Sequence, residues 1–451
     1  MHLQIHQCRK AGRCNESCRF FSPRVARARK TSLAHLLTAE FLTETWKQIN
    51  RRGASGVDGE TAKEYERGLD TRVQELCERL KRGAYKAPPV RRVEIPKGPG
   101  RAGTRPLGIP TVADRALQRS ASQVLSAIYE QDFLSCSFGG RPGRGAHQAL
   151  ATLHERIAGG KIEWVLEAGL KNFFGSLSHE WMLRFVEHRV GDQRLISLIR
   201  RWLKAGVLED GEIHPNEEGT PQGGSISVLL SNLYLHYVLD LWFERVVKPR
   251  LRGEAGMVRY IDDFVLCFQY RADALRAQET LVKRLRRFSL TLELTKTKLV
   301  EFGRFAYRHA SKRGRKRPET ICFLGLTLYC TRNQKGNFRI AMRTEKSRLR
   351  RALMRLQDQM RRMRHLSPQE QVNHLNQMLR GHYAYYGVAG NLRALLRVHR
   401  AVEHYWRKML SSRSWHGRIR WEQFQRIKEQ FPLLRPKLHH SYRELQAIAI
   451  L

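Results

Sequence analysis

The sequence predicts an α+β fold, in which helices and strands are mixed as far as about residue 330 and an all-helical, basic module follows. Three observations lead to this prediction. Short apolar runs rich in aromatic and β-branched residues, such as those within 256–268, are typical of strands. Longer segments such as 114–132 repeat apolar residues at helical spacing. From residue 345 onward helical spacing dominates, so the strands are expected to end before this point.

The predicted elements follow one another in irregular order, and no internal repeat is visible. Helices are predicted at 32–50, 61–82, 114–132, 149–157, 179–190, 193–204, 226–246 and 272–288. Strands are predicted at 90–96, 163–166, 290–294 and 321–329, with two short strands near 206–214 and two more flanking Asp262 and Asp263.

The chain is strongly basic, with 82 Lys and Arg against 42 Asp and Glu and a net charge of +40. The excess is not confined to a tail, because residues 331–451 carry 26 Lys and Arg against 7 Asp and Glu. Such a field attracts polyanions, and nucleic acid is favoured among them. A hydrophobic content of 41% and eight Trp argue for large folded cores rather than a histone-like protein.

Hydropathy and cysteine usage predict a cytoplasmic protein without a membrane span. No apolar run reaches the length of about 18 residues that a spanning helix needs. Scattered cysteines in apolar surroundings are typical of reduced core thiols. The cysteines of this kind are Cys77, Cys136, Cys267, Cys322 and Cys330.

Residues 1–30 are predicted to form a basic N-terminal extension, with Glu16 as its only acidic residue. Because the extension is rich in Arg, an organelle-targeting peptide is an alternative, and an organellar location stays open. A zinc site is a further alternative, although the spacing lacks the usual C-x-x-C pairs. The residues that raise it are His6, Cys8, Cys14 and Cys18.

The segment G-M-V-R-Y-I-D-D-F-V-L-C-F, residues 256–268, places Asp262 and Asp263 between two predicted strands. Adjacent carboxylates at such a turn repel each other unless a cation neutralises them. Mg²⁺ binds one or two carboxylates and completes its shell with water and phosphate. The pair is therefore a candidate metal-binding and catalytic site for phosphoryl transfer. An ordinary solvated Asp-Asp turn is the alternative.

Six stretches resemble, in order, the motifs of reverse transcriptases and maturases encoded by group II introns. They are R-P-L-G-I-P-T-V-A-D-R-A-L-Q from 105, S-F-G-G-R-P-G-R-G-A-H from 137, G-T-P-Q-G-G-S-I-S from 219, Y-I-D-D from 260, Lys296-Thr297, and F-L-G-L-T from 323. The segment L-R-G-H-Y-A-Y-Y-G-V-A-G-N from 379 resembles the intron-binding maturase segment of the same family. A single such motif is weak, but six in this order are specific.

The resemblance implies a right-hand polymerase fold, with fingers at 31–160, a palm with an antiparallel sheet at 161–330, and an all-helical thumb and maturase-specific RNA-binding region at 331–451. It implies an RNA-directed DNA polymerase that uses Mg²⁺ and deoxynucleoside triphosphates to extend a DNA primer or target on an RNA template. It also implies a maturase that binds intron RNA and aids its splicing. These functions require the hairpin at 256–268 to pack beside the strand that begins at Trp164, in a cleft for a templated duplex.

The resemblance also implies roles for individual residues. Asp262 and Asp263 would be catalytic and bind the metal, and Lys296 would protonate the departing pyrophosphate. The implied nucleotide-binding residues are Lys97, Arg105, Phe174, Gln222 and Lys296. The implied RNA- or primer-binding residues are Arg141, Arg144, Phe323, Gly325, Arg393, Arg397 and Arg400. For the cations the alternative is a solvated surface, and for Tyr383 and Trp406 the core of a helix bundle is favoured over RNA contact.

The chain departs from the family pattern in the strand that begins at Trp164. Gly169 stands where the family has the Asp that bridges both metals, and Glu167, on the same face of the strand, lies about 6.6 Å upstream. Without the bridging carboxylate, ions are bound more weakly and placed less well. The alternative functions are therefore a catalytically inactive, reverse-transcriptase-like splicing factor that binds RNA, or a basic nucleic-acid scaffold of another role. Gly175 and Ser178 also replace usual Asp residues, Gly140 a usual Phe, and Val228 a usual Pro.

Overall fold

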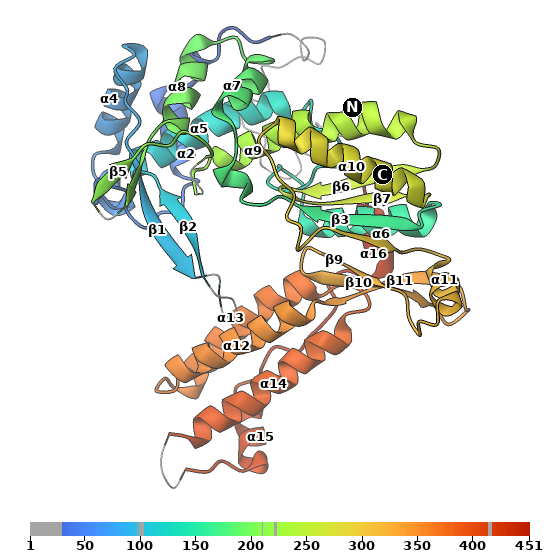
Figure 1. The fold of residues 1–451 in the computed structure, drawn as a ribbon. Helices are drawn as coiled ribbons and strands as arrows, with labels where there is room; N and C mark the ends of the chain where they lie inside the picture. The colour runs from blue at the N-terminus through green and yellow to red at the C-terminus, as the bar shows by residue number, and fades with distance from the viewer. Residues whose placement is uncertain (1–28, 97, 99–102, 210, 221–222, 414–416) are drawn as a thin grey trace.

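The structure, a computed structural model, describes residues 29–96, 98, 103–209, 211–220, 223–413 and 417–451, and it mixes helices with three sheets, which confirms the predicted mixture (Figure 1). The predicted N-terminal extension lies almost entirely outside the described residues, as do His6 and the three cysteines of the candidate zinc site.

The helices are α2 (Ala39–Trp46), α3 (Ala62–Glu66), α4 (Leu69–Lys81), α5 (Val112–Tyr129), α6 (Ala146–Gly159), α7 (His179–Glu187), α8 (Gln193–Leu203), α9 (Ser227–Leu235), α10 (Arg271–Arg287), α11 (Ala306–Lys312), α12 (Lys346–Arg362), α13 (Pro368–Tyr386), α14 (Leu392–Ser411), α15 (Trp421–Gln430) and α16 (Tyr442–Ile448). The strands are β1 (Val90–Pro96), β2 (Thr104–Ile109), β3 (Trp164–Gly169), β4 (Val207–Glu209), β5 (Glu212–His214), β6 (Ala255–Tyr260), β7 (Asp263–Phe268), β8 (Lys298–Glu301), β9 (Thr320–Phe323), β10 (Leu326–Arg332) and β11 (Phe338–Thr344).

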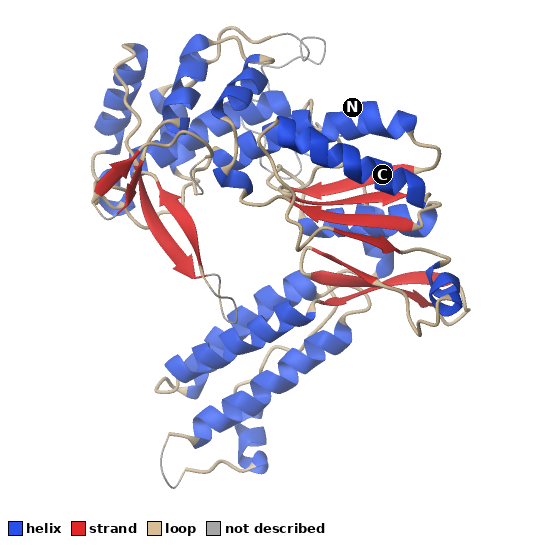
Figure 2. Ribbon diagram, in the orientation of Figure 1, coloured by secondary structure: helices blue, strands red, loops and turns tan. Residues whose placement is uncertain are grey.

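The sheet that carries Asp263 has the strand order β6-β7-β3-β8, and all of its strand pairs are antiparallel. Helix α10 covers one face and α6 the other, with α16 packed on α6 (Figure 2). A sheet covered on both faces buries alternate side chains on either side. This explains why the residues of β7 after Asp263 form an unbroken apolar run that is buried throughout.

The other two sheets differ from the prediction in detail. In the sheet β2-β1-β4-β5, β1 pairs with β4 in parallel, so this sheet is mixed. The predicted strand 321–329 is divided into β9 and β10 by a turn at Leu324 and Gly325, which have φ values of +49° and +76°. The predicted strand 290–294 is wrong, because only an isolated bridge joins Leu292 to Leu170. The apolar pattern continues through both segments and therefore does not mark these interruptions.

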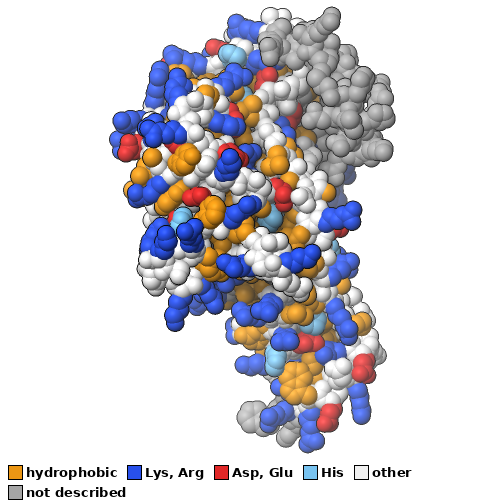
Figure 3. All heavy atoms as spheres, turned by 90° about the vertical axis from the view of Figure 1, so that its right-hand side faces the viewer, with side chains coloured by type: hydrophobic (Ala, Val, Ile, Leu, Met, Phe, Trp, Pro, Cys, Tyr) orange, Lys and Arg blue, Asp and Glu red, His pale blue; other side chains and the backbone are white. Residues whose placement is uncertain are grey.

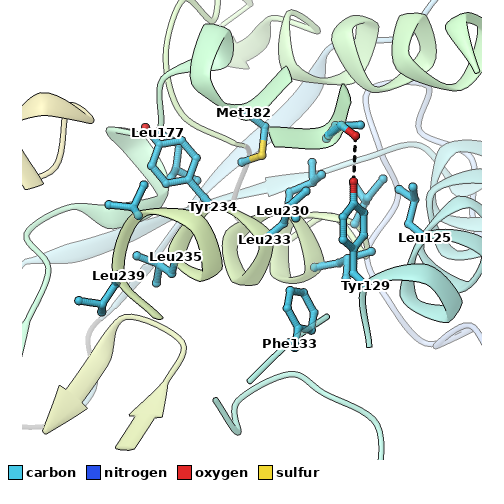
Figure 4. Packing of buried hydrophobic residues seen from close by; sticks show 14 of the residues in the cluster. Leu125, Tyr129, Phe133, Leu177, Met182, Leu230, Leu233, Tyr234, Leu235 and Leu239 are labelled. Atoms are coloured by element: carbon cyan, nitrogen blue, oxygen red, sulfur yellow. Dashed lines mark hydrogen bonds between the residues drawn. The ribbon is translucent and has the colours of Figure 1, made fainter. Parts of the chain in front are cut away.

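The largest core packs α9 against α5 and α7. Nearly all side chains of α9 are buried, which explains why this helix has no polar face. Tyr129 donates a hydrogen bond to the carbonyl oxygen of Val186, 3.0 Å away, and this bond is drawn as a dashed line in Figure 4. Figure 4 also shows the apolar side chains that meet there, among them Phe133, Met182, Leu230, Leu233 and Tyr234.

A fully buried ion pair joins the helical segment after α9 to strand β6. The segment widens to a π-type turn at His236–Asp240. There the Asp240 carboxylate accepts two hydrogen bonds from Arg259, at 2.7 and 2.6 Å, and both side chains are 0% exposed. The remaining N–H groups of Arg259 donate to the Asn232 side chain, the Ser137 hydroxyl and the carbonyl oxygen of Ile261. All five guanidinium donors therefore have acceptors.

Helices α12 to α15 form a module with its own core (Figure 1). Tyr383 and Trp406 lie in that core, each 1% exposed, which confirms the prediction for both. Strand β11 precedes the module, and the expected boundary at residue 330 falls inside β10. After α15 the chain returns to the central sheet, where the backbone N–H of His439 donates to the carbonyl oxygen of Gly387 and α16 packs against α6.

The described cysteines are free thiols. Four are buried, as predicted, whereas Cys322 is exposed because it points to the face of β9 opposite to that of the buried Ile321 and Phe323. Among the described residues, no helix combines the length and the apolar character that a membrane crossing demands.

Replacement of Asp240 by Asn should destabilise the protein by about 3–5 kcal/mol, because the Arg259 charge would stay buried without its partner. The measurement is the urea midpoint of unfolding followed by circular dichroism. Glu180→Gln is the matched control, since it removes the exposed ion pair of Glu180 with Arg184 and should leave the midpoint unchanged. Equal midpoints for the two variants would contradict a structural role for the buried pair.

Candidate active site

Asp262 lies in the two-residue turn of the β6–β7 hairpin, directly before Asp263. Ile261, the other residue of the turn, has a φ of +57°, which is strained for a β-branched side chain. Two contacts hold it there. Arg259 donates to its carbonyl oxygen at 3.0 Å, and Gly139 approaches so closely that a Cβ at 139 would lie 2.6 Å from Ile261 Cγ1. The buried ion pair and this glycine thus fix the turn that presents the carboxylates.

The hairpin packs beside β3, as the resemblance requires, because Gly169 pairs with Asp263 at the end of that strand. A Cβ at Gly169 would lie 3.1 Å from Asp263 Oδ1 and 4.0 Å from the backbone oxygen of Asp262. A side chain at position 169 would therefore begin next to the Asp263 carboxylate. The glycine leaves the pair without the third acidic group that the family pattern has at this point.

The electrostatics of the pair favour a bound cation. Burial, and after it the adjacent charge of Asp263, raise the pKa of Asp262, while the positive charges of Lys296 and Arg105 oppose this rise. Lys296 Nζ lies 3.8 Å from Asp263 Oδ1, and both side chains are about half exposed. Among the described residues, no cluster of three His, Cys, Asp or Glu side chains is suited to a metal. The donors fit a hard divalent cation that takes one or two carboxylates and completes its shell with water or phosphate.

Glu167 does not replace the missing carboxylate in this structure. Its side chain accepts a hydrogen bond of 2.7 Å from the backbone N–H of Cys322, so it links β3 to the neighbouring strand β9. Burial raises the pKa of Glu167 to about 7, against the opposing effect of that hydrogen bond. The Glu167 carboxylate therefore links two sheets and does not complete the acidic site at Asp262 and Asp263.

Phe174 lies beside the loop that leads to Gln222. The backbone N–H of Thr220 donates to the carbonyl oxygen of Phe174 at 2.7 Å. Gly219, with a φ of +82°, comes so near that a Cβ there would lie 2.6 Å from the same oxygen. The structure thus joins this loop to the helical turn Phe173–Gly175, which follows β3. Gln222 itself, and Lys97, lie outside the described residues.

The predicted contact of Arg141 with template or nucleotide is corrected by its burial. Its side chain is 3% exposed and pairs with the Glu130 carboxylate at 2.8 Å. It also donates to the carbonyl oxygens of Leu134 and Ser137. With these partners the guanidinium stabilises the Gly-rich turn and is closed to a ligand. Arg144, by contrast, is partly exposed above a neighbouring aromatic ring.

Two departures from the family pattern have structural explanations. Gly140 has a φ of +68°, and a Cβ there would lie 2.2 Å from Val228 Cγ1, so the position has no room for a side chain. Ser178 is the N-cap of α7, since its side chain accepts a hydrogen bond from the backbone N–H of Trp181. Ser and Asp are both good N-caps, so this replacement keeps the capping function.

An open pocket beside the carboxylates is bounded by the β9–β10 turn and by two helices of the helical module. Leu324 and Gly325 line it, whereas Phe323 is 3% exposed and packs in the core, which corrects its predicted contact with a primer. Tyr385 of α13 donates to the carbonyl oxygen of Leu324 at 2.9 Å and so supports the turn. The residues that line the pocket are Tyr260, Ile261, Asp262, Asp263, Leu324, Gly325, Arg348, Tyr385 and Tyr386.

Sequence reasoning missed two groups of residues here. Arg348, Tyr385 and Tyr386 line the pocket, although the sequence placed the two tyrosines only in the segment from 379 that resembles the intron-binding maturase segment. Arg259 and Asp240 were also missed. A signal existed for that pair, because each is a charged residue inside an otherwise apolar stretch, and such residues are buried only when paired.

The predicted arginines of the helical module lie on α14, and all three are exposed. Arg393, Arg397 and Arg400 are spaced by four and three residues, which places them on one face of the helix. That face stays a predicted RNA contact.

The sequence of the chain is similar to those of several known proteins. Residues 95–328 match the family model for reverse transcriptase (RNA-dependent DNA polymerase). The chain is 34% identical over 229 residues to protein YkfC of Escherichia coli K12, which covers 49% of this chain and 60% of YkfC. It is 35% identical over 213 residues to the group II intron-encoded protein LtrA of Lactococcus lactis subsp. cremoris, covering 46% of this chain and 35% of LtrA. It is 31% identical over 151 residues to nuclear intron maturase 4, mitochondrial, of Arabidopsis thaliana, covering 33% and 18%. The chain thus spans less than two thirds of the length of each of these relatives.

Two tyrosines of α13 provide a matched test of the pocket wall. Tyr385→Phe should destabilise the protein by about 1 kcal/mol, because the carbonyl oxygen of Leu324 loses its donor. Tyr383→Phe should be neutral or stabilising, since within the described part of the chain the buried Tyr383 hydroxyl has no hydrogen-bond partner. Thermal unfolding of the two variants measures the difference. If Tyr383→Phe were the more damaging change, the assignment of the Tyr385 hydrogen bond would be wrong.

Proposed function

Because this chain belongs to the reverse transcriptase (RNA-dependent DNA polymerase) family, whose model matches just over half of its length, we propose that it is a group II intron-type RNA-directed DNA polymerase and maturase. Reverse transcriptase domains generally use a divalent metal. The proposed substrates are deoxynucleoside triphosphates, a DNA primer or target, and an RNA template. The names of LtrA and of the Arabidopsis maturase support the intron and maturase parts of the proposal.

The observation that carries the polymerase proposal is the position of the Asp262–Asp263 turn, at the end of β3 and open to a pocket. Asp262 and Asp263 would hold Mg²⁺, which when bound would activate a primer hydroxyl and neutralise charge on the triphosphate. Lys296 has its ammonium group beside Asp263, at a suitable place to donate a proton to a leaving phosphate oxygen. Arg105 adds positive charge that acts on Asp262.

The arrangement of the elements supports a right-hand polymerase. In this proposal, residues 31–160 are the fingers, the sheet with Asp263 is the palm, and α12 to α15 are the thumb. Because β10 and β11 pair as a hairpin, we place the end of the palm after β11, near residue 345, and not at 330. The pocket residues Arg348, Tyr385 and Tyr386 would then belong to the thumb and lie next to the catalytic turn.

The maturase proposal depends on the basic helical module. Its sequence carries 26 Lys and Arg against 7 Asp and Glu over residues 331–451. The exposed face with Arg393, Arg397 and Arg400 offers guanidinium groups to phosphates of a structured RNA. Intron RNA is the proposed partner of this face.

Primer extension on an RNA template with purified protein and Mg²⁺ tests the polymerase proposal. Wild type should extend the primer, and Asp262→Asn should reduce the rate by about 10²-fold or more, because it weakens the metal site. Removal of Mg²⁺ with a chelator should abolish extension in both proteins. Extension that is unaffected by Asp262→Asn would show that the catalytic site lies elsewhere.

Gly169→Asp should increase the rate at limiting Mg²⁺ by about tenfold, because it adds a third carboxylate opposite Asp263. A Cβ at 169 would lie 3.1 Å from Asp263 Oδ1, which a shift of a few tenths of an ångström relieves. Gly169→Asn is the control of equal shape without charge and should give no gain. If neither wild type nor Gly169→Asp extends a primer while wild type still promotes splicing of an intron in vitro, the protein is a splicing factor without polymerase activity.

A further inference from the structure

The connection between β8 and β9 is the most concentrated basic segment of the described chain outside the helical module. Residues 303–318, G-R-F-A-Y-R-H-A-S-K-R-G-R-K-R-P, contain seven Lys and Arg and no acidic residue. The segment includes the short helix α11, which lies at one edge of the molecule in Figure 1. Figure 3 faces that side and shows more Lys and Arg than Asp and Glu across it.

Two of these seven cations have acidic partners. Arg313 pairs with Glu301, which also binds His309, and Arg315 pairs with Glu319 at 3.4 Å. The other five are exposed, and within the described part of the chain they form no ion pair and no side-chain hydrogen bond. They are Arg304, Arg308, Lys312, Lys316 and Arg317.

Five unpaired cations in 14 residues repel one another and raise the free energy of the isolated protein. A polyanion that binds there would remove this repulsion and release its own counterions. Phe305 stands among the cations and is 45% exposed, although it is aromatic. Exposed aromatic rings beside Lys and Arg are suited to unpaired bases of a nucleic acid, which stack on rings while the phosphates contact the cations.

The segment lies at the end of the central sheet opposite the catalytic turn. Gly169, the last residue of β3, pairs with Asp263, whereas Trp164, the first, pairs with Glu301, the last residue of β8. Residue 303 follows directly after that end. Five residue steps along β3 correspond to about 16 Å, which is the length of about five base pairs of duplex. A nucleic acid bound at α11 is therefore separate from one that occupies only the pocket at Asp262.

We propose that residues 303–318 form a second RNA-binding surface, which holds a structured RNA outside the catalytic pocket. This inference rests on the proposed function only for the choice of RNA as the polyanion. The five unpaired cations would contact phosphates, and Phe305 would stack on an unpaired base. The surface would add affinity for long, folded RNA and would not contribute to catalysis on a short primer–template.

The test compares two triple variants that remove equal charge. The first is Arg308→Gln, Lys312→Gln and Lys316→Gln in the α11 surface. The control is Lys283→Gln, Arg286→Gln and Arg287→Gln, three exposed cations at the far end of α10. That end is distant because Arg271, at the start of α10, stacks over Trp164, and Lys283 lies 12 residues later, about 18 Å along the helix.

Binding of a folded RNA of about 100 nucleotides is measured between 50 and 300 mM KCl, next to primer extension on a short primer–template. For the α11 variant we expect affinity to fall at least about tenfold and the slope of log K against log salt to fall by about 2 to 3. In the control variant, the affinity and the salt slope should change by much less. Primer extension should be unchanged in both variants. Photocrosslinking to RNA from a photoreactive residue at position 305 should succeed in the full chain.

Three results would overturn the proposal. Equal losses of affinity in both variants would mean that only overall charge matters. A loss of short-template extension in the α11 variant would assign the segment to the catalytic cleft. Binding of the segment to vesicles with anionic phospholipid, without any effect on RNA affinity, would make it a lipid contact.

Failure of wild type to extend primers, with RNA affinity still dependent on α11, would refute the polymerase proposal and leave this one standing.

Discussion

The buried pair of Arg259 and Asp240 is the interaction on which the rest of the site depends. It joins the helix after α9, the Gly-rich turn at Ser137 and the tip of the β6–β7 hairpin. Burying two charges is costly, and here the mutual attraction and the satisfied donors offset that cost. The result is a rigid frame around a strained residue, Ile261, so that the carboxylates project from a fixed turn and not from a mobile loop.

The frame holds two carboxylates within a protein of net charge +40. Burial and the adjacent charge of Asp263 disfavour the ionised form of Asp262, whereas the positive charges of Lys296 and Arg105 favour it. Gly169 alters this balance, because an absent carboxylate lowers both the affinity for a cation and the repulsion of incoming phosphate. In the proposed function, the positive charge of the chain would attract nucleic acid while few ligands would hold the metal, and different residues would set these two properties.

Much of this arrangement could be predicted from sequence, and the failures have physical causes. Ordered motifs predict which segments meet, so the pairing of β3 with the Asp262–Asp263 hairpin was foreseen. They do not predict which way a side chain points, and Arg141 and Phe323 therefore turned out to be buried. The split of 321–329 depends on a left-handed backbone at Leu324, which apolar periodicity does not encode. Arg259 and Asp240 lie 19 residues apart, and only the folded chain brings them together.

The return of the chain from α15 to α6 ties the helical module to the body of the protein at both of its ends. At its beginning the backbone N–H of Glu345 donates to the carbonyl oxygen of Gly325, and after α15 the helix α16 packs against α6. Between these ends Tyr385 donates to the carbonyl oxygen of Leu324, and the side chain of Asn391 accepts a hydrogen bond from the backbone N–H of Thr344. Because several contacts far apart in the sequence clamp the module, the width of the pocket at Gly325 is set by the same hydrogen bonds that anchor the helices.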